Sequence, residues 1–292
     1  MTNIIQARHL NKFYGKQQVL NNINLQVNPG EIVGIVGVNG AGKSTLLKSL
    51  LGLTRVSGDL NVCGLNPRQA QDKLMQTVSF IADTATLPKW ITAAQLFDYS
   101  EAVHPKFNRN LAEQFLENTE IKPNMRVKKM SKGMITQLHL ALVIAIESDL
   151  LVLDEPTLGL DIIRRKAFYN SLLEDYFDHN NTILITTHQI EEIEHILTRV
   201  IFIDNGLIVL DEQIENLENR FIQLETLPEY QTQVEQLKPI YSQKTLSGHR
   251  YIFDGQDSQT LSQFGKINTP ELADLFVAML SPKTATEHRE AC

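Results

Sequence analysis

The spacing of hydrophobic residues changes repeatedly along the first 212 positions of this chain, and the changes predict a series of strands and helices. Short runs in which almost every residue is apolar predict strands buried on both faces of a sheet, at residues 32–36, 150–153, 182–186 and 200–203. Other apolar stretches predict strands at residues 4–8, 19–27, 58–62 and 76–82. Polar turns are expected at residues 11–16 and 28–30, and a hairpin turn at residues 204–206.

Helical spacing separates several of these strands. Residues 45–51 have a helical pattern, and from Pro88 to about Ile146 strand-forming residues thin out while apolar residues recur at helical intervals. The second section predicts a helical subdomain over about residues 88–147. Because strands separated by helical patterns are typical of α/β proteins, we expect an α/β main domain over residues 1–212.

Beyond Glu212 the chain is more polar and carries less pattern. Short strands are predicted at residues 221–224 and 251–253, and an amphipathic helix at residues 271–280. Pro270 suits the start of that helix because a proline is well tolerated there. We expect a small α+β accessory domain over residues 213–292. Its last helix either packs on the main domain, which we favour, or recognises a partner.

Composition excludes several classes of protein. The chain has 292 residues, of which 42% are hydrophobic and 21% charged, and a net charge of −7 argues against a nucleic-acid partner. Cys63 and Cys292 are too far apart for a metal motif or a disulfide framework, which suits a reducing cytosol. The longest apolar run, residues 140–146, is far below the roughly 18 residues of a membrane span. Residues 1–6 lack the basic start and the apolar block of a signal peptide, so none is expected there. We therefore expect any membrane role to come through a partner.

The chemistry centres on residues 37–44, which read GVNGAGKS between a predicted buried strand and a helical pattern. This context is typical of a phosphate-binding loop, in which glycines let backbone N–H groups and a helix N-terminus converge on phosphate oxygens. Lys43 would add a positive charge toward the terminal phosphates. Ser44 would offer its hydroxyl to Mg²⁺, which prefers oxygen ligands.

Polar side chains at the ends of two further predicted strands add to this site. Asp154 and Glu155 follow a buried strand, where ligands of open α/β sheets bind. We assign Asp154 to the metal and Glu155 to the base that accepts a proton from an attacking water. His188 ends another buried strand, and either contacts a γ-phosphate or is only a structural histidine. Tyr14 either stacks on a nucleotide base or packs on the sheet.

The order and spacing of these features resemble the nucleotide-binding subunit of ATP-binding cassette (ABC) transporters. The motifs that carry the resemblance are Tyr14, GVNGAGKS at 37–44, MSKGM at 130–134, LLVLDEPT at 150–157, LGLD at 158–161 and His188. The resemblance covers about residues 4–212. It implies a P-loop NTPase fold with a RecA-like core, an antiparallel β subdomain and a helical subdomain. It also implies ATP and Mg²⁺ as the bound cofactors.

The family pairs two cassettes head to tail, with each ATP between the phosphate loop of one subunit and the signature motif of the other. By resemblance, Tyr14 stacks on adenine and Val19 lines the ribose. The phosphates are then held by Gly37, Val38, Asn39, Gly40, Ala41, Gly42, Lys43, Ser44 and Thr45.

The same resemblance assigns roles outside the phosphate loop. Ser131 and Gly133 would reach the γ-phosphate bound to the other subunit, and Asp161 would bridge the two subunits. Glu155 would polarise the attacking water, and His188 would sense the γ-phosphate. Catalysis in such a site consists mainly of positioning and charge neutralisation.

Two positions depart from the family pattern. Lys132 stands within a signature that usually reads LSGGQ, and it either adds charge near a phosphate or points to solvent. Asp83 stands where the family has a glutamine that touches Mg²⁺ and relays closure to the membrane subunit. A carboxylate is anionic and cannot donate, so Asp83 either binds Mg²⁺ directly or repels the γ-phosphate. We expect Asp83 to remain a ligand of the metal region.

The resemblance implies a cytoplasmic ATPase at the inner face of the membrane, driving a separate permease and paired with a second cassette as a homodimer or heterodimer. The SKGM signature and the tail at residues 270–276 look like bacterial export-type members. One rival is a soluble member of the superfamily acting in translation or DNA repair. Another is a cassette with weakened catalysis that acts as a nucleotide-dependent regulator, suggested by Asp83 and Lys132.

Overall fold

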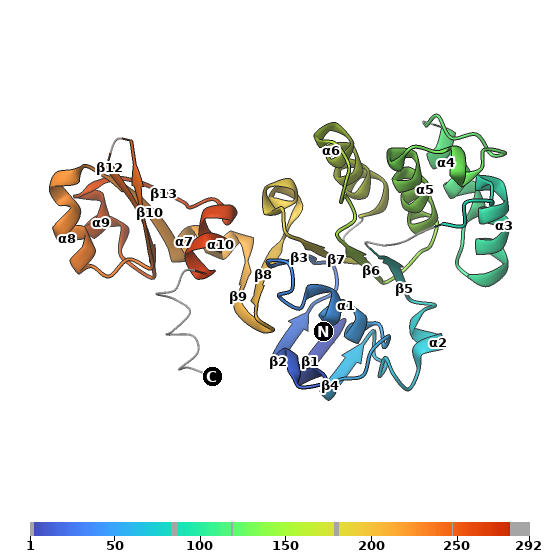
Figure 1. Cartoon of the computed structure of the whole chain (residues 1–292), viewed down its shortest axis with the longest axis horizontal. Helices are drawn as coiled ribbons and strands as arrows, with labels where there is room; N and C mark the ends of the chain where they lie inside the picture. The colour runs from blue at the N-terminus through green and yellow to red at the C-terminus, as the bar shows by residue number, and fades with distance from the viewer. Residues whose placement is uncertain (1–2, 83–86, 118, 178–180, 247, 281–292) are drawn as a thin grey trace.

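The computed structural model describes residues 3–82, 87–117, 119–177, 181–246 and 248–280. Three sheets organise this part of the chain (Figure 1). The helical subdomain lies at one end of the molecule and the C-terminal sheet at the other, with the six-stranded sheet between them. No described helix is long and apolar enough to cross a membrane.

The central sheet has six strands in the order β5-β6-β7-β3-β8-β9. Its strands are β3 (Ile32–Val36), β5 (Val78–Ile81), β6 (Leu150–Asp154), β7 (Thr182–Thr187), β8 (Arg199–Asp204) and β9 (Leu207–Gln213). The first five in this order run parallel, and β9 pairs antiparallel with β8 across the predicted turn at residues 204–206. This is the predicted α/β sheet.

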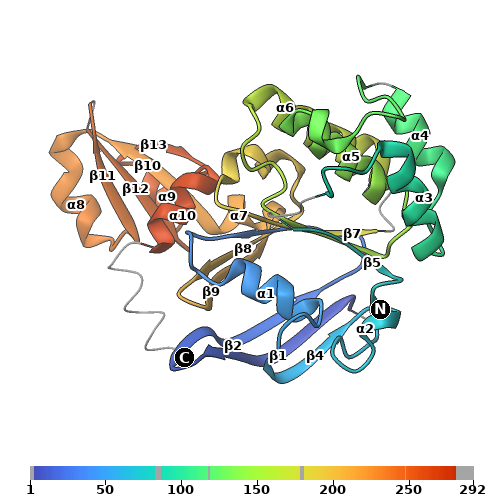
Figure 2. The same cartoon turned by 45° about the vertical axis from the view of Figure 1, so that its right-hand side comes forward.

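Both faces of the central sheet are buried, as its apolar runs predict. Side chains of a strand alternate between faces, so Ile32 and Val36 of β3 join one hydrophobic cluster while Val33 and Ile35 join the other. Helix α1 (Lys43–Leu50) lies between this sheet and the three-stranded sheet (Figure 2). Its Leu47 is fully buried in the second cluster.

The antiparallel sheet has the order β2-β1-β4 and is made of β1 (Ile5–Tyr14), β2 (Gln17–Val27) and β4 (Ser57–Val62). The predicted turn at residues 11–16 is wrong in its extent, because β1 continues to Tyr14 and pairs it with Gln17. Only Gly15 and Lys16 form the turn, and Gly15 takes φ = 60°. The last residues of β1 are exposed or half-buried, so no apolar alternation marks them as strand.

The helical subdomain contains α3 (Ala93–Val103), α4 (Arg109–Glu117), the 3₁₀ turn η1 (Val127–Lys129) and α5 (Lys132–Ile144). These helices share a separate hydrophobic cluster that includes Phe97, Leu116 and Leu138. A capping box begins α3: the Thr92 hydroxyl accepts from Gln95 N, and the Gln95 side chain accepts from Thr92 N. The predicted helical section is therefore present.

The remaining helical elements before β8 vary in length. They are α2 (Gln71–Leu74), α6 (Ile162–Ser171), the π-helical turn η2 (Leu172–Tyr176) and the 3₁₀ turns η3 (Ile190–Glu192) and η4 (Glu194–Ile196). Helix α2 lies within a stretch for which the sequence analysis predicts no helix.

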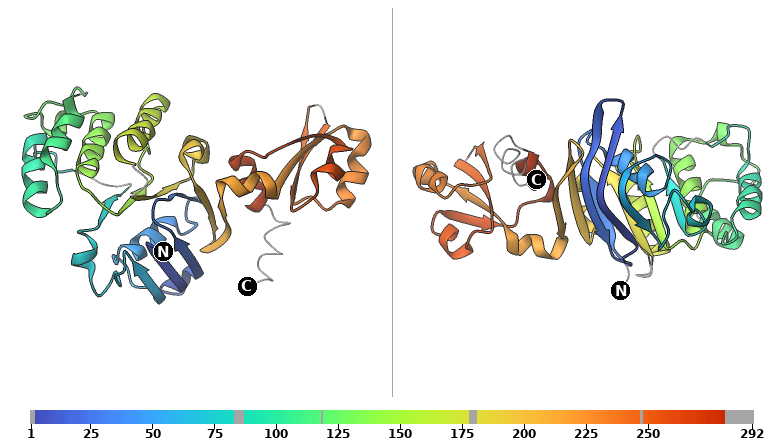
Figure 3. Two further views of the ribbon diagram at one scale, coloured as in Figure 1. Left: turned by 180° about the vertical axis from the view of Figure 1, so that it is seen from behind. Right: turned by 90° about the horizontal axis from the view of Figure 1, so that it is seen from below.

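The C-terminal part forms an antiparallel sheet in the order β11-β12-β10-β13. Its elements are α7 (Ile214–Arg220), β10 (Phe221–Thr226), η5 (Pro228–Tyr230), α8 (Gln231–Gln236), β11 (Tyr241–Thr245), β12 (Gly248–Asp254), α9 (Ser258–Ser262), β13 (Gly265–Asn268) and α10 (Leu272–Leu280). Ile222, Leu224 and Phe253 contribute to a small core of this part alone. Figure 3 shows the sheet beyond β9, away from the helical subdomain.

Helix α10 returns to the core of the central sheet. Its Leu275 is fully buried in the same cluster as Phe202 of β8, and the rings of Phe276 and Phe202 meet edge to face at 5.0 Å between centroids. The backbone N–H of Leu272 also donates to a carboxylate oxygen of Glu194 at 3.3 Å. This is the packing role that we favoured for the last helix.

Leu275→Ala is expected to lower the free energy of unfolding by about 2–5 kcal/mol, because it opens a cavity in the core that joins α10 to the central sheet. Val277→Ala is the matched control, since Val277 is half exposed on the same helix. Urea unfolding of both variants measures the difference. Equal losses in the two variants would contradict the packing described here.

Candidate functional site

The loop between β3 and α1 requires glycine at specific positions. Gly42 takes φ = 113°, and a Cβ on it would lie 2.9 Å from the carbonyl oxygen of Val19. A Cβ on Gly37 would lie 2.6 Å from the carbonyl oxygen of Ile203. Side chains at these two positions would therefore clash with neighbouring backbone, and the loop can bend around the N-terminus of α1 only without them.

Lys43, the first residue of α1, is buried against this loop. Its Nζ donates to the carbonyl oxygen of Gly37 at 2.8 Å and lies 3.3 Å from Oε1 of Glu155. The ammonium is thus held between the loop and the end of β6. It offers a fixed positive charge to any anion that enters beside it.

Asp154 ends β6 with a carboxylate that is only 3% exposed. Its Oδ1 accepts from the Ser44 hydroxyl at 3.1 Å and from the Thr186 hydroxyl of β7 at 2.6 Å. Because a buried carboxylate is costly without donors, these two hydroxyls stabilise the charge of Asp154. Ser44 and Asp154, both predicted as ligands of Mg²⁺, are hydrogen-bonded to each other, whereas Thr186 is absent from the sequence-based site.

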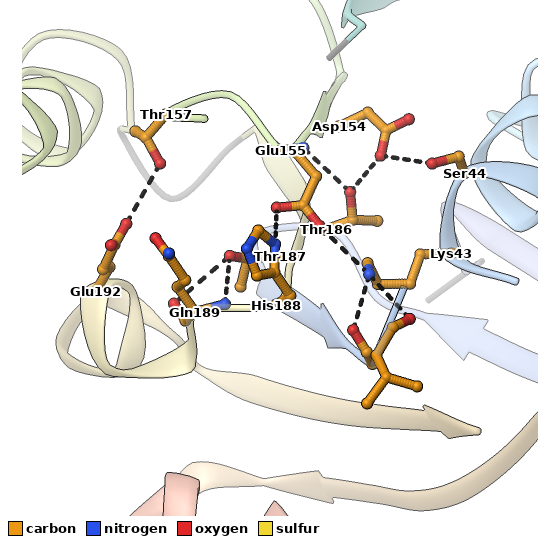
Figure 4. Close-up of polar contacts among 12 residues, drawn as sticks. Lys43, Ser44, Asp154, Glu155, Thr157, Thr186, Thr187, His188, Gln189 and Glu192 are labelled. Atoms are coloured by element: carbon orange, nitrogen blue, oxygen red, sulfur yellow. Dashed lines mark hydrogen bonds and ion pairs between the residues drawn. The ribbon is translucent and has the colours of Figure 1, made fainter. Parts of the chain in front are cut away.

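Glu155 adopts φ = 48°, an uncommon backbone conformation for a residue other than glycine. In this conformation the Glu155 carboxylate lies between two side chains. Its Oε1 is close to Lys43, and its Oε2 lies 2.7 Å from Nδ1 of His188. Figure 4 shows Glu155 between these two side chains, with Asp154 and Ser44 beside it. The ends of β6 and β7 and the start of α1 thus meet at one point.

A pocket of about 580 Å³ opens over this point. Its lining consists of Tyr14, Gln17, Val19, Asn39, Gly40, Gly42, Lys43, Ser44, Thr45, Glu155, Leu158 and His188. Gln17 and Leu158 are absent from the sequence-based site. Gln17 follows the β1–β2 turn and pairs with Tyr14. The end of β1 has no apolar alternation, so the sequence does not reveal the hairpin register that places Gln17 at the pocket.

Several predicted site residues lie outside the pocket lining. Asp154 lies behind Ser44, and Gly37, Val38 and Ala41 belong to the loop without lining the pocket. Ser131 caps the start of α5 and Asp161 the start of α6, each accepting from a backbone N–H of its own helix. Gly133 is buried beside the Arg164 side chain. Lys132 is exposed, and Asp83 falls outside the residues that the structure describes.

The donor groups of this pocket suit a polyphosphate and a hard divalent cation. The loop offers backbone N–H groups at a helix N-terminus, and Lys43 adds a cation. Ser44 and Asp154 offer neighbouring oxygens, the ligands that Mg²⁺ prefers. Tyr14 is 51% exposed at the pocket edge, so part of its ring is accessible to a bound group.

Comparison with known proteins agrees with this geometry. The sequence profile of the ABC transporter family matches residues 20–158. An uncharacterized ABC transporter ATP-binding protein of Bacillus subtilis (strain 168) is 29% identical over 96% of this chain and 92% of its own length. The Nod factor export ATP-binding protein I of Cupriavidus metallidurans is 30% identical over 87% of this chain and 86% of its own length. The solved structure of cbiO1 from Clostridium perfringens, part of the ABC transporter complex cbiONQ, is 26% identical with a TM-score of 0.63, covering 73% of this chain and 89% of its own.

Thr186→Val is expected to lower the free energy of unfolding by about 1.5–3 kcal/mol, because the buried carboxylate of Asp154 loses a donor. Thr187→Val is the matched neighbour, since within the described residues its hydroxyl contacts neutral backbone groups of Gln189: it accepts from the N–H at 3.0 Å and donates to the carbonyl at 3.5 Å. That variant should lose about 0.5–1.5 kcal/mol in the same urea titration. Equal losses of unfolding free energy in the two variants would show that the Asp154 carboxylate does not depend on the Thr186 hydroxyl.

Proposed function

This chain belongs to the ABC transporter ATP-binding proteins, and from this premise we propose that its pocket binds MgATP and hydrolyses it to drive a separate membrane permease. Proteins of this family are ATPases. The observation that carries the assignment of the pocket is the convergence of Lys43, Glu155 and His188 over the phosphate-type loop. Ser44 and Asp154 lie directly beside them.

The adenine and ribose would occupy the outer part of the pocket. Tyr14 carries Lys12 Nζ at 4.6 Å from its ring centroid, so a cation already lies over the ring. The adenine would stack on the accessible ring surface, and Val19 would line the ribose side. The triphosphate would then follow residues 37–45 toward the N-terminus of α1.

Ser44 and Asp154 would hold Mg²⁺, and Asp83 is proposed as a further group of the metal region. The ion would neutralise charge on the phosphate oxygens. The Ser44 hydroxyl now donates to Asp154, so both groups already point to one place. Thr186 keeps the Asp154 carboxylate in its orientation by donating to Oδ1.

Glu155 would orient and deprotonate the attacking water, and His188 would donate to the γ-phosphate. The hydrogen bond between His188 Nδ1 and Glu155 Oε2 fixes the two side chains relative to each other. Lys43 would exchange its contact with Glu155 for the terminal phosphates, which frees that carboxylate for its role as a base.

The second half of the ATP site would come from another cassette. Ser131, Gly133 and Asp161 do not line the pocket of their own chain, as a head-to-tail dimer requires. In that arrangement Ser131 and Gly133 would contact the γ-phosphate bound to the partner, and Asp161 would bridge the subunits. A homodimer and a heterodimer both satisfy this geometry.

The permease would be a separate chain that places this subunit at the cytoplasmic face of the membrane. We propose an export function, which the similarity to the Nod factor export protein supports. Residues 1–212 would form the ATPase, with residues 88–147 as its helical subdomain, and residues 213–292 would form an accessory domain. No nucleic-acid partner is proposed, in keeping with the net charge of −7.

The rival functions are less well supported. A role in translation or repair has no counterpart among the relatives described above, whose names refer to ABC transporters or export. A regulator with weakened catalysis would not need Lys43 and His188 both in contact with Glu155, yet both contacts are present. Turnover therefore distinguishes the proposed function from the second rival.

Glu155→Gln is expected to lower ATP turnover by about 100- to 10,000-fold, because the glutamine cannot accept the proton of the water. The variant should still bind ATP and form an ATP-dependent dimer in size-exclusion chromatography. Glu191→Gln is the control, since this exposed carboxylate belongs to the short turn after His188. Wild-type turnover in Glu155→Gln would remove Glu155 from the catalytic role.

A further inference from the structure

Residues 156–161, which run from Glu155 at the end of β6 to the start of α6, are held by two tight turns. The N–H of Leu158 donates to the carbonyl of Glu155 at 3.1 Å, and the N–H of Leu160 donates to the carbonyl of Thr157 at 3.0 Å. Asp161, the N-cap of α6, ends this segment. The segment thus begins beside Glu155 and ends at the residue proposed to face a second subunit.

Arg165, in the first turns of α6, ties this segment to the chain that follows His188. Its Nε donates to the carbonyl oxygen of Leu160 at 2.6 Å. Its terminal NH1 group contacts the side-chain oxygens of Gln189 and Glu192. One guanidinium therefore connects the end of the 156–161 segment to the turn η3.

A second set of contacts joins Thr157, at the other end of the same segment, to Glu192 and to α6. The Thr157 hydroxyl donates to Oε2 of Glu192 at 3.4 Å, and it shares a hydrogen bond of 3.1 Å with the hydroxyl of Tyr169. Tyr169 is one turn beyond Arg165 on α6 and is buried, and this burial raises the pKa of its hydroxyl. Figure 4 shows Thr157 and Glu192 facing each other beside His188 and Gln189.

We propose that Arg165 is a positioning residue that makes the 156–161 segment and the His188-bearing segment move as one body. This inference rests on the proposed function, and it assigns to this chain a route from the γ-phosphate to Asp161. A shift of His188 would displace Gln189 and Glu192, and through Arg165 it would displace the carbonyl of Leu160. Asp161, the next residue, would then move with it.

The chemistry of the contact favours arginine. The side chain of Arg165 is 21% exposed and that of Glu192 is 19%, so solvent screens the pair only partly. A guanidinium donates in several directions from one rigid plane and can bind Leu160, Gln189 and Glu192 together. A lysine would keep the charge, but its single ammonium on a flexible stem would not hold the three acceptors in one geometry.

The test compares Arg165→Ala, Arg165→Lys and Glu192→Gln with the wild type and with Lys166→Ala. Lys166 is the matched control because it is the exposed next residue of α6 and takes part in no ion pair within the described residues. ATP affinity, ATP turnover and melting temperature are measured on the full chain. Hydrogen exchange of residues 157–161 and 188–192 is followed with and without ATP.

We expect Arg165→Ala to lower turnover roughly ten- to a hundredfold, since misplacing groups around a reacting centre has effects of this size. ATP affinity should stay close to the wild type, as in Lys166→Ala, while the melting temperature falls because Glu192 loses its partner. Arg165→Lys should recover part of the turnover. In the wild type, ATP should protect both segments together, whereas in Arg165→Ala it should protect only residues 188–192.

Three results would overturn the positioning role. One is wild-type turnover in Arg165→Ala. Another is a parallel fall of affinity, melting temperature and turnover, which would mean that Arg165 only stabilises the fold. The third is joint protection of both segments by ATP in Arg165→Ala. Because hydrogen exchange needs binding but not hydrolysis, it tests the coupling even if the wild type proves inactive, a result that would contradict the proposed ATPase instead.

Discussion

The whole site depends on the parallel arrangement of the central sheet, which brings the carboxyl ends of β3, β6 and β7 to one edge. The phosphate-type loop leaves β3, Asp154 and Glu155 end β6, and Thr186 and His188 come from the end of β7. Because β7 lies between β3 and β6, its Thr186 can support the Asp154 carboxylate while Asp154 meets Ser44 of α1. Residues distant in sequence thus meet at one edge of the sheet.

Much of this arrangement is predictable from the sequence, because burial on both faces of a sheet restricts the residue types that a strand can have. A strand such as β3, with all five residues buried, must be an apolar run, and the glycines of the next loop mark a backbone that side chains would obstruct. The end of β1 shows no such pattern, because Asn11 and Lys12 are half-buried and the aromatic Phe13 and Tyr14 are exposed. Thr186 and Arg165 act through partners 32 and 27 residues away, Asp154 and Glu192, so local pattern cannot identify them.

The C-terminal part shows two separate effects of packing. Its sheet and short helices enclose a small core of their own, whereas α10 contributes Leu275 and Phe276 to the core beneath β8. The C-terminal part is therefore attached to the central sheet through buried apolar contacts and is more than a polar extension of the chain. Its position is fixed relative to β8, which neighbours the strand that carries the phosphate-type loop.

The central claim is that Lys43 and the glycine loop bind the phosphates of MgATP, and isothermal titration calorimetry tests it most directly. The account predicts saturable ATP binding by the wild type that weakens when Mg²⁺ is chelated. Lys43→Ala should weaken binding at least about tenfold, since a hydrogen bond to a charged group contributes roughly 1.5–3 kcal/mol. Lys48→Ala, an exposed position on the same helix, should bind like the wild type. No magnesium-dependent binding by the wild type would contradict the account.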